Sequence, residues 1–451
     1  MKKKLLKIFA FIFCAGLFLT GCATVSNVQD AMGNKISFDA PVYYQGQVAK
    51  VGDYVYYGNA YTDISGEEFK YTKARKSSYL ARVDLSSLSY DEEVLKENYN
   101  HTSPLGVEKV NGKKLAGYVN QEMFAYGDYL YFTSANVHKS SSMQNDYSMV
   151  SLFRVRFNGD GLKEIGTFTN DENSSITIQE GSDGKYYFVI VCPVEKTEED
   201  ETTTYDVYSI KVGNSIGSTT KIASGVNSVV VADESSSLKN IVCTYGTDSE
   251  RLPNAVKAVD YATGDETVYD GGNSETIALC GRVGDVVMYS YNSEVYYKDL
   301  TIGGTFSPSQ TQLFYSAESI SNVEKMGEGY MFVGATALMY KSSLSATATK
   351  LTETSSYKHI LFVDGDYVYL SNDNAIMKIS CFGGEIETVV SDMTIISGEC
   401  GYADGYIYFY ATLGDIVDED GNVVERESED TNYYMYRTDK LGNVQLLGKT
   451  K

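Results

Sequence analysis

The stretch DGDYVYLSNDNAIMKISCFGGEIETVV, which runs from Asp364 to Val390, decides the fold of this chain. Short runs of apolar and aromatic residues alternate in it with turn sequences, and the run HILFVDG leads into it. Runs of four to seven such residues, separated by Gly, Asn and Asp, are typical of antiparallel strands joined by tight turns. The stretch therefore predicts a unit of four antiparallel strands, which we call a, b, c and d, with no helix.

The same pattern recurs along the chain. VGDYVYYGNA occupies residues 51–60, YGDYLYFTSA residues 126–135 and ADGYIYFYAT residues 403–412. Turns of this kind recur at intervals of roughly 40 to 75 residues, a period typical of solenoids and propellers. The anchors of the predicted a–b turns are Gly52-Asp53, Gly127-Asp128, Asp183-Gly184, Asp233, Gly284-Asp285, Gly327-Glu328, Gly365-Asp366 and Asp404-Gly405.

A four-stranded repeat without helices is typical of a propeller blade. We expect an all-β chain in which residues 36–451 form a single β-propeller of four-stranded antiparallel blades. Eight blades are predicted, with seven as the alternative because residues 229–269 are irregular. The content of 39 Tyr and 40 Gly agrees with an all-β chain. In the first blade the strands are expected in APVYYQGQVA, YVYYGNA, SYLARVDL and EEVL, and each blade keeps its own four strands, so that closure shares none.

The N-terminus resembles a bacterial lipoprotein signal. Four lysines within the first seven residues precede an apolar run, residues 8–19, that is shorter than the roughly 20 residues a membrane helix needs. The run ends in Leu19-Thr20-Gly21-Cys22, which resembles a lipobox. The resemblance implies a signal peptide at 1–21, acylation of Cys22 and a membrane tether at 22–35. It places the protein on the extracytoplasmic face of a bacterial cell membrane, or on the outer membrane where one exists.

The net charge and the cysteine spacing exclude some classes of partner and of metal site. Loss of residues 1–21 removes four lysines and no acidic residue, so the net charge of −22 becomes −26. Such a chain is repelled by nucleic acid, which is not expected as a partner. With Cys14 removed and Cys22 acylated, five cysteines remain; most lie in apolar segments, and none has metal-ligand spacing. We expect buried core thiols, with one disulfide left open, and no metal or cofactor.

The strand sequences carry a second resemblance. The motifs G-D-Y-[VL]-Y-[YF] and L-x-R-V-D resemble the DUF5050-like and YWTD-like β-propellers of bacterial secreted proteins, which are often lipoproteins. The resemblance extends over most of residues 40–450. It implies a fold and no activity.

The predicted b–c connections differ in length from blade to blade. In a propeller the a–b and c–d turns lie on one face, and the b–c and d–a connections on the other. The b–c connections are long in blades 1, 2, 3 and 8 (61–78, 134–148, 193–204 and 413–432), which are neighbours in a closed ring, and short in blades 5 to 7. The d–a connection 98–121 joins them, and insertions gathered on one face often form a binding surface. The candidate binding residues are Tyr61, Lys73, Arg75, His101, Lys113, Lys114, His138, Asp418 and Asp420.

Two acidic features have a structural interpretation. The aspartates of the a–b turns would ring one face, and Asp is favoured in turns for local hydrogen bonding, with a calcium-attracting ring as the second interpretation. The sequence from Asp418 to Asn422 fails the spacing of an EF-hand loop and predicts a hairpin turn.

No catalytic motif stands out. The chain has three histidines, and its one GxSxG, Gly213–Gly217, lacks the strand-to-helix context of a nucleophile elbow. We therefore expect a non-enzymatic binding or scaffold module for a protein or a glycan. The alternatives are a cell-surface carbohydrate-active hydrolase or lyase that uses carboxylates of the channel, and an envelope-assembly lipoprotein, which rests on fold analogy.

Overall fold

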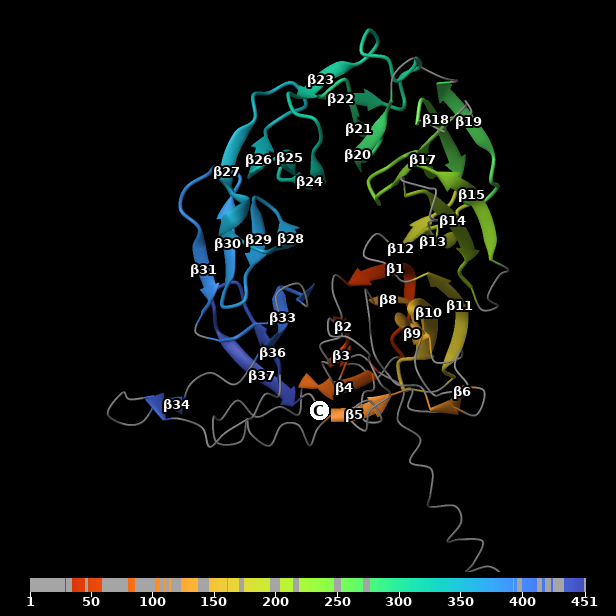
Figure 1. The fold of residues 1–451 in the computed structure, drawn as a ribbon. Coiled ribbons are helices and arrows are strands. Elements are labelled where there is room, and N and C mark those ends of the chain that lie inside the picture. Colours follow the sequence, from red (N-terminus) through yellow and green to blue (C-terminus); the bar gives the residue numbers. More distant parts are fainter. Residues whose placement is uncertain are drawn as a thin grey trace, which may run out of the picture.

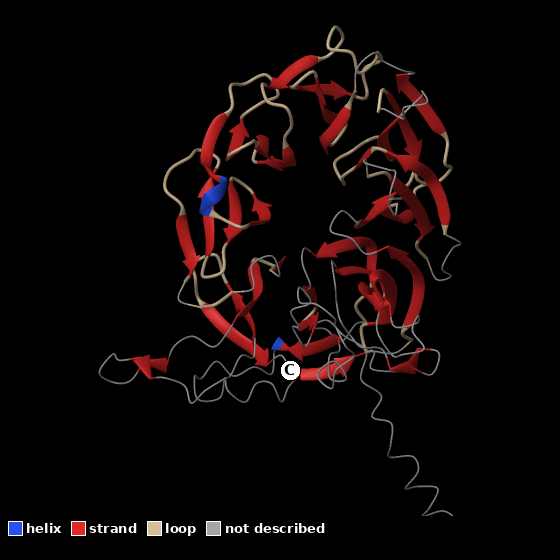
Figure 2. Ribbon diagram, in the orientation of Figure 1, coloured by secondary structure: helices blue, strands red, loops and turns tan. Residues whose placement is uncertain are grey.

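The computed structural model arranges eight blades in a ring (Figure 1), and nearly every element is a strand (Figure 2). Eight blades, rather than the alternative seven, form the propeller, and the irregular segment 229–269 is a complete blade. The structure describes residues 29, 35–44, 48–58, 80–85, 102–105, 109–110, 113–114, 123–136, 146–159, 161–169, 174–194, 203–213, 219–246, 253–270, 276–391, 393–395, 400–411, 416–417, 423–424 and 434–449.

Blades 1 to 4 each contain four consecutive strands. They are β2 (Val48–Val51), β3 (Tyr54–Gly58), β4 (Leu80–Asp84) and β5 (Thr102–Leu105); β8 (Met123–Gly127), β9 (Tyr129–Asn136), β10 (Asp146–Arg156) and β11 (Lys163–Thr169); β12 (Ser175–Glu180), β13 (Tyr186–Pro193), β14 (Tyr205–Lys211) and β15 (Thr220–Val226); and β16 (Ser228–Val231), β17 (Asn240–Tyr245), β18 (Ala255–Asp260) and β19 (Glu266–Asp270).

Blades 5 to 8 follow the same plan, and blade 8 has a hairpin inserted before its third strand. They are β20 (Ala278–Val283), β21 (Val286–Tyr291), β22 (Glu294–Asp299) and β23 (Gln312–Tyr315); β24 (Ser321–Met326), β25 (Gly329–Val333), β26 (Ala337–Lys341) and β27 (Thr349–Glu353); β28 (His359–Asp364), β29 (Tyr367–Ser371), β30 (Ile376–Ser380) and β31 (Glu387–Val390); and β32 (Gly401–Ala403), β33 (Tyr406–Ala411), β36 (Tyr434–Thr438) and β37 (Val444–Lys449). A 3-10 turn, η4 (Thr354–Ser356), leads from β27 to β28.

The turn anchors and the buried strands explain the repeat. Each predicted anchor lies between strands a and b of its blade, and at Gly52 and Gly365 the backbone has φ of 59°, a left-handed value that favours glycine. Strand b is buried on both faces because each blade packs between two others. Val55, Tyr56 and Tyr57 are consecutive in β3, and none of them is exposed.

The five remaining cysteines lie where core thiols were expected. Cys192, Cys243, Cys381 and Cys400 are buried, and Cys280 is half-buried. Desolvation raises the pKa of the Cys243 thiol to about 12. Burial therefore keeps this thiol protonated and unreactive.

Ring closure occurs between blades 8 and 1, each of which is made from its own stretch of chain. As the sequence predicts, the two ends share none of the described strands. Strand β2 instead lies against β32, and Val48 and Val51 share one apolar cluster with Ala403 and Tyr408. Side-chain packing therefore closes the ring.

The first strand departs from the expectation. The run APVYYQGQVA was predicted as strand a of blade 1, but it divides in two. Its first part belongs to β1 (Phe38–Tyr44), which pairs antiparallel with β8 of blade 2, with Val42 opposite Ala125. Only the second part, β2, belongs to blade 1. Both parts are apolar strand sequences, so the pattern alone does not select their partners.

Strand β1 thus makes blade 2 five-stranded, in the order β1-β8-β9-β10-β11. Figure 1 shows β1 on the inner side of that blade. The fourth strand of blade 1 is also corrected. It is β5, whereas the predicted run EEVL, residues 92–95, lies outside the described residues. Among the described residues, no helix is long and apolar enough to cross a membrane.

Candidate binding surface

The b–c connections divide the ring into two sectors. They span only residues 292–293, 334–336 and 372–375 in blades 5, 6 and 7. The long ones span 59–79, 137–145, 194–204 and 412–433 in blades 1, 2, 3 and 8, which lie next to one another in Figure 1. A further one, 246–254 in blade 4, continues the series, and the sequence reasoning left it out. Long connections therefore occur in five neighbouring blades, and the four predicted ones are among them.

Two small hairpins belong to this sector. Strands β34 (Ile416–Val417) and β35 (Val423–Val424) pair within the connection of blade 8, and Figure 1 shows β34 standing out beyond the ring. Asp418 and Asp420 fall between these two strands, which confirms the hairpin. Strands β6 (Lys109–Val110) and β7 (Lys113–Lys114) pair between blades 1 and 2.

The candidate residues are placed only in part. Lys113 and Lys114 form β7, and their backbones pair with Val110 and Lys109. The other candidates lie outside the described residues; they are Tyr61, Lys73, Arg75, His101, His138, Asp418 and Asp420, together with the acylation candidate Cys22.

Buried polar contacts tie the blades beneath this sector to one another. Arg82 and Tyr56 of blade 1 both donate to the carbonyl of Phe157 in blade 2, from Nη1 at 2.9 Å and from Oη at 2.8 Å. Arg154 Nη1 of blade 2 donates to the carbonyl of Gly213 in blade 3 at 3.2 Å.

The series continues from blade 3 to blade 4, where Ser209 Oγ donates to the carbonyl of Tyr261 at 2.8 Å. Arg82, Arg154 and Ser209 lie on strand c and Tyr56 lies on strand b, and each acceptor lies just after strand c of the next blade. Such buried bonds fix the blades relative to one another, so the connections above them extend from a rigid base.

Three aspartates of the a–b turns form ion pairs with lysines. Asp183 pairs with Lys211 at 2.9 Å, Asp404 pairs with Lys50 at 2.7 Å, and Asp128 pairs with Lys35. In the part of the chain that the structure describes, no three His, Cys, Asp or Glu side chains gather as a metal site would require. These three carboxylates are therefore engaged by side chains of the protein itself.

Asp285, in the a–b turn of blade 5, binds the a–b turn of blade 4. Its carboxylate accepts hydrogen bonds from the Ser236 hydroxyl at 2.7 Å and from the Leu238 N–H at 3.0 Å, and Ser237 donates to it as well. Burial alone would raise the pKa of Asp285, but these bonds hold it at about 2. The buried Arg282 guanidinium lies 3.7 Å from this carboxylate and donates to Asn240. The network joins blades 4 and 5.

A polar cleft of about 270 Å³ lies between blades 3 and 4 and was not foreseen. Asp260, inside it, accepts the N–H groups of Ala262 at 2.8 Å and Thr263 at 2.9 Å, so its carboxylate already serves the turn. Sequence reasoning could not find the cleft because one wall is the a–b turn of blade 3 and the other is formed by strands and the c–d turn of blade 4. Its lining residues are Ser182, Asn240, Ala258, Asp260, Thr263, Asp265 and Thr267.

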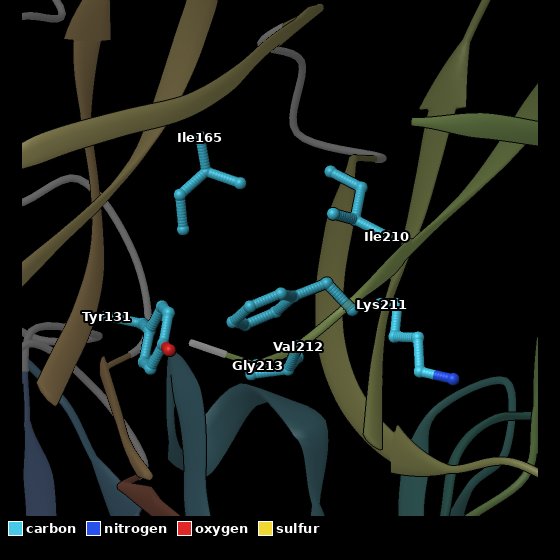
Figure 3. Close-up of a pocket in the computed structure, with 7 residues that line it drawn as sticks. Tyr131, Ile165, Ile210, Lys211, Val212 and Gly213 are labelled. Atoms are coloured by element: carbon cyan, nitrogen blue, oxygen red, sulfur yellow. The ribbon is translucent and has the colours of Figure 1, made fainter. Parts of the chain in front are cut away.

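A second space lies between blades 2 and 3 (Figure 3). Ile165, Ile210 and the Tyr131 ring face it, and it encloses about 170 Å³ between walls too close together for a water molecule. The Lys211 ammonium points away in Figure 3 and pairs with Asp183. This space is a packing gap between blades.

The described residues give little support to a catalytic function. Gly213 follows β14, and β15 is the next strand of the same blade, so the GxSxG lies in a c–d connection. The structure does not describe residues 214–218. His359 is exposed at the start of β28. Glu324, on the inner strand β24, is the one described carboxyl whose pKa is raised, and its burial is the cause.

No protein-family model and no curated protein matches the chain. A puromycin hydrolase is similar to it at 9% identity and a TM-score of 0.40, with 90% of this chain and 54% of that one covered. A periplasmic gluconolactonase of Pseudomonas aeruginosa is similar at 11% identity and a TM-score of 0.39, with 71% of this chain and 96% of that one covered. An uncharacterised protein of Listeria monocytogenes EGD-e is similar at 10% identity and a TM-score of 0.37, with 72% of this chain and 92% of that one covered. This chain thus spans about half of the puromycin hydrolase. Identities this low concern the fold alone.

Proposed function

We propose that this protein is a lipid-anchored, extracytoplasmic β-propeller that works as a non-enzymatic binding or scaffold module. Cys22 carries the acyl chains, and residues 22–35 form the tether. The ligand, a protein or a glycan, is bound by the b–c connections of blades 8, 1, 2 and 3. We also propose that the chain is one of the DUF5050-like and YWTD-like propellers, on the strength of its repeat motif.

One observation carries the proposal. The long connections belong to neighbouring blades, whereas blades 5 to 7 turn within two to four residues at the same face. Long insertions gathered over a rigid scaffold are a common form of binding surface. Strands b and c can be joined without a long connection, because residues 292–293 alone join them in blade 5.

The experiment compares cross-linked capture from native membranes by two forms of the protein. The test form has the four long connections shortened to the length of residues 372–375. The matched control has only the blade 4 connection, 246–254, shortened in the same way. We expect one identified partner to be captured by the intact protein and by the control, and to be lost by the test form. Equal capture by all three forms would show that these four b–c connections do not bind the partner.

One observation favours the hydrolase alternative. A glycosidase needs one carboxylic acid that stays protonated near neutral pH, and Glu324 is the described carboxyl whose burial shifts its pKa in that direction. If glycans from the host envelope are cleaved by the intact protein and left uncleaved by E324Q, the protein is an enzyme and the scaffold proposal fails. The envelope-assembly alternative predicts a different partner for the same sector, a component of membrane machinery.

A further inference from the structure

The most exposed apolar side chains among the described residues lie on one face of the ring. Among the described residues the three most exposed large apolar side chains are Ile302 at 63%, Phe382 at 82% and Leu441 at 86%. All three lie in c–d turns, those of blades 5, 7 and 8. The opposite ends of blades 5 to 7 are described too, and their b–c turns hold only Asn, Ser, Gly, Ala, Thr and Asp.

The apolar turns are held in place by hydrogen bonds. In blade 8 the Asp439 carboxylate accepts the N–H groups of Leu441 at 2.9 Å and Asn443 at 3.0 Å. In blade 7 the N–H of Phe382 donates to the Ser380 hydroxyl at 3.2 Å. These side chains are therefore presented outward by ordered turns, and a partner that covers them has little conformational entropy to remove.

The blade 5 turn is fixed in a similar way. The Lys298 ammonium donates to the carbonyl of Ile302 at 2.6 Å and to that of Gly303 at 3.0 Å. The lysine charge is thus drawn back under the turn, and the isoleucine side chain forms its outer surface.

The N-terminal segment reaches the ring at the same face. Phe38, at the start of β1, is opposite Gly127 of the a–b turn of blade 2, and Lys35 pairs with Asp128 of that turn. Because a–b and c–d turns share one face, Lys35 and the start of β1 lie at the face that carries the apolar turns.

The tether is short. Gln29 pairs with Lys35 in an isolated bridge, and Cys22 precedes Gln29 by seven residues, which span at most roughly 25 Å when extended. An acyl group on Cys22 would therefore keep the a–b and c–d face close to the bilayer. The tether arrives at blade 2, whereas the apolar turns belong to blades 5, 7 and 8, so the points of attachment are spread around the ring.

We infer that this face lies against the lipid bilayer, with Ile302, Phe382 and Leu441 at the level of the headgroups; the inference rests on the proposed acylation of Cys22. Apolar side chains enter that region readily, whereas the acidic chain is repelled by anionic headgroups. The contact is therefore apolar and forms on zwitterionic phosphatidylcholine. The long b–c connections then face away from the membrane, where a partner can reach them.

The absence of tryptophan allows a direct test. Three single-tryptophan variants of the full, lipidated protein are made, F382W and L441W in the c–d turns and N374W in the b–c turn of blade 7 as the matched control. Each is reconstituted in phosphatidylcholine vesicles with and without brominated acyl chains, which quench nearby indole rings. Acylation of Cys22 is read separately, from the mass of the N-terminal peptide.

We expect F382W and L441W to lose most of their fluorescence in brominated vesicles and to emit at shorter wavelength, while N374W is unchanged. An acylated protein in which all three variants behave alike overturns the membrane-facing assignment and leaves the anchor intact. An unacylated Cys22 overturns the anchor, and the inference with it. Quenching relieved when the protein is concentrated on the vesicles would mean that a second copy covers the turns, which also overturns the assignment.

Discussion

The Arg82 guanidinium lies over the ring of Tyr54, with its carbon 4.3 Å from the ring centroid. Tyr54 is the first tyrosine of the GDYVY copy in blade 1, and Arg82 stands opposite the second one, Tyr56, on the neighbouring strand. A cation over an aromatic face is worth about 0.5 to 2 kcal/mol. The same arrangement recurs in the three other closest copies, as Arg154 over Tyr129 at 4.4 Å, Lys378 over Tyr367 at 5.3 Å and Arg437 over Tyr406 at 4.4 Å.

The first prediction concerns Arg82, which is buried and donates to blade 2. R82A should lower the free energy of unfolding by about 3 kcal/mol, because it removes a buried donor and leaves a cavity. R82M, which refills much of that volume, should cost about 1 kcal/mol. Urea unfolding followed by circular dichroism measures both.

The matched control for Arg82 is K378A in blade 7. Lys378 pairs with the exposed Glu387 at 3.2 Å and should contribute about 0.5 kcal/mol. If R82A is no more costly than K378A, the contact between blades 1 and 2 does not stabilise the ring.

The second prediction compares two buried serines. Ser209 donates to the carbonyl of Tyr261, so S209A should destabilise the protein by about 1 kcal/mol. The Ser371 hydroxyl is buried and has no hydrogen-bond partner among the described residues, so S371A should be neutral or stabilising by up to about 1 kcal/mol. Thermal unfolding of the two variants side by side decides the point, and an equal loss of stability in both would contradict it.

The third prediction is a dependence on pH. The pKa of Asp285 is about 2 in the folded protein, below the ordinary value of 3.8. The lowered value contributes stability that is present above pH 4 and is lost as the pH falls through 2, about 2 kcal/mol in all. D285N should lose this contribution at neutral pH and show a flatter stability profile between pH 4 and 2, measured by urea unfolding.

The control for Asp285 is D183N, at an exposed a–b turn whose carboxylate pairs with Lys211. Solvent and salt screen this pair, so its effect should be small and should vanish at high ionic strength. A D285N profile that runs parallel to the wild type would show that the blade 4–5 network does not depend on this charge.

The fourth prediction tests whether β1 is an integral part of the ring. Tyr44, at the end of β1, is 5% exposed, and its hydroxyl donates to the carbonyl of Lys50. Y44A should cost about 4 kcal/mol, and Y44F, which keeps the ring, about 1 kcal/mol. An unchanged thermal midpoint for Y44A would mean that β1 can leave without consequence.

The sequence foretold the blades because their cause is local. Most repeats carry a left-handed glycine in the a–b turn, and several carry buried tyrosines in strand b. The run from Asp364 to Val390 gives β29, β30 and β31 at their observed places. The pairing of β1 with β8 is a contact between segments far apart in the chain, and either half of APVYYQGQVA would make a strand. The cleft between blades 3 and 4 was not predicted for the same reason, because residues of two different repeats line it.

The pairing of β1 with β8 also sets an order of events during biosynthesis. The chain emerges from its N-terminus, so β1 is present long before Met123, where its partner begins, and blade 1 is complete long before β37 can finish blade 8. Each blade can collapse as soon as its own residues emerge, yet the open flank of blade 1 is covered only at the end. A chain that stops early therefore leaves the apolar flank of blade 1 exposed to solvent. Chaperones and proteases can bind this exposed surface.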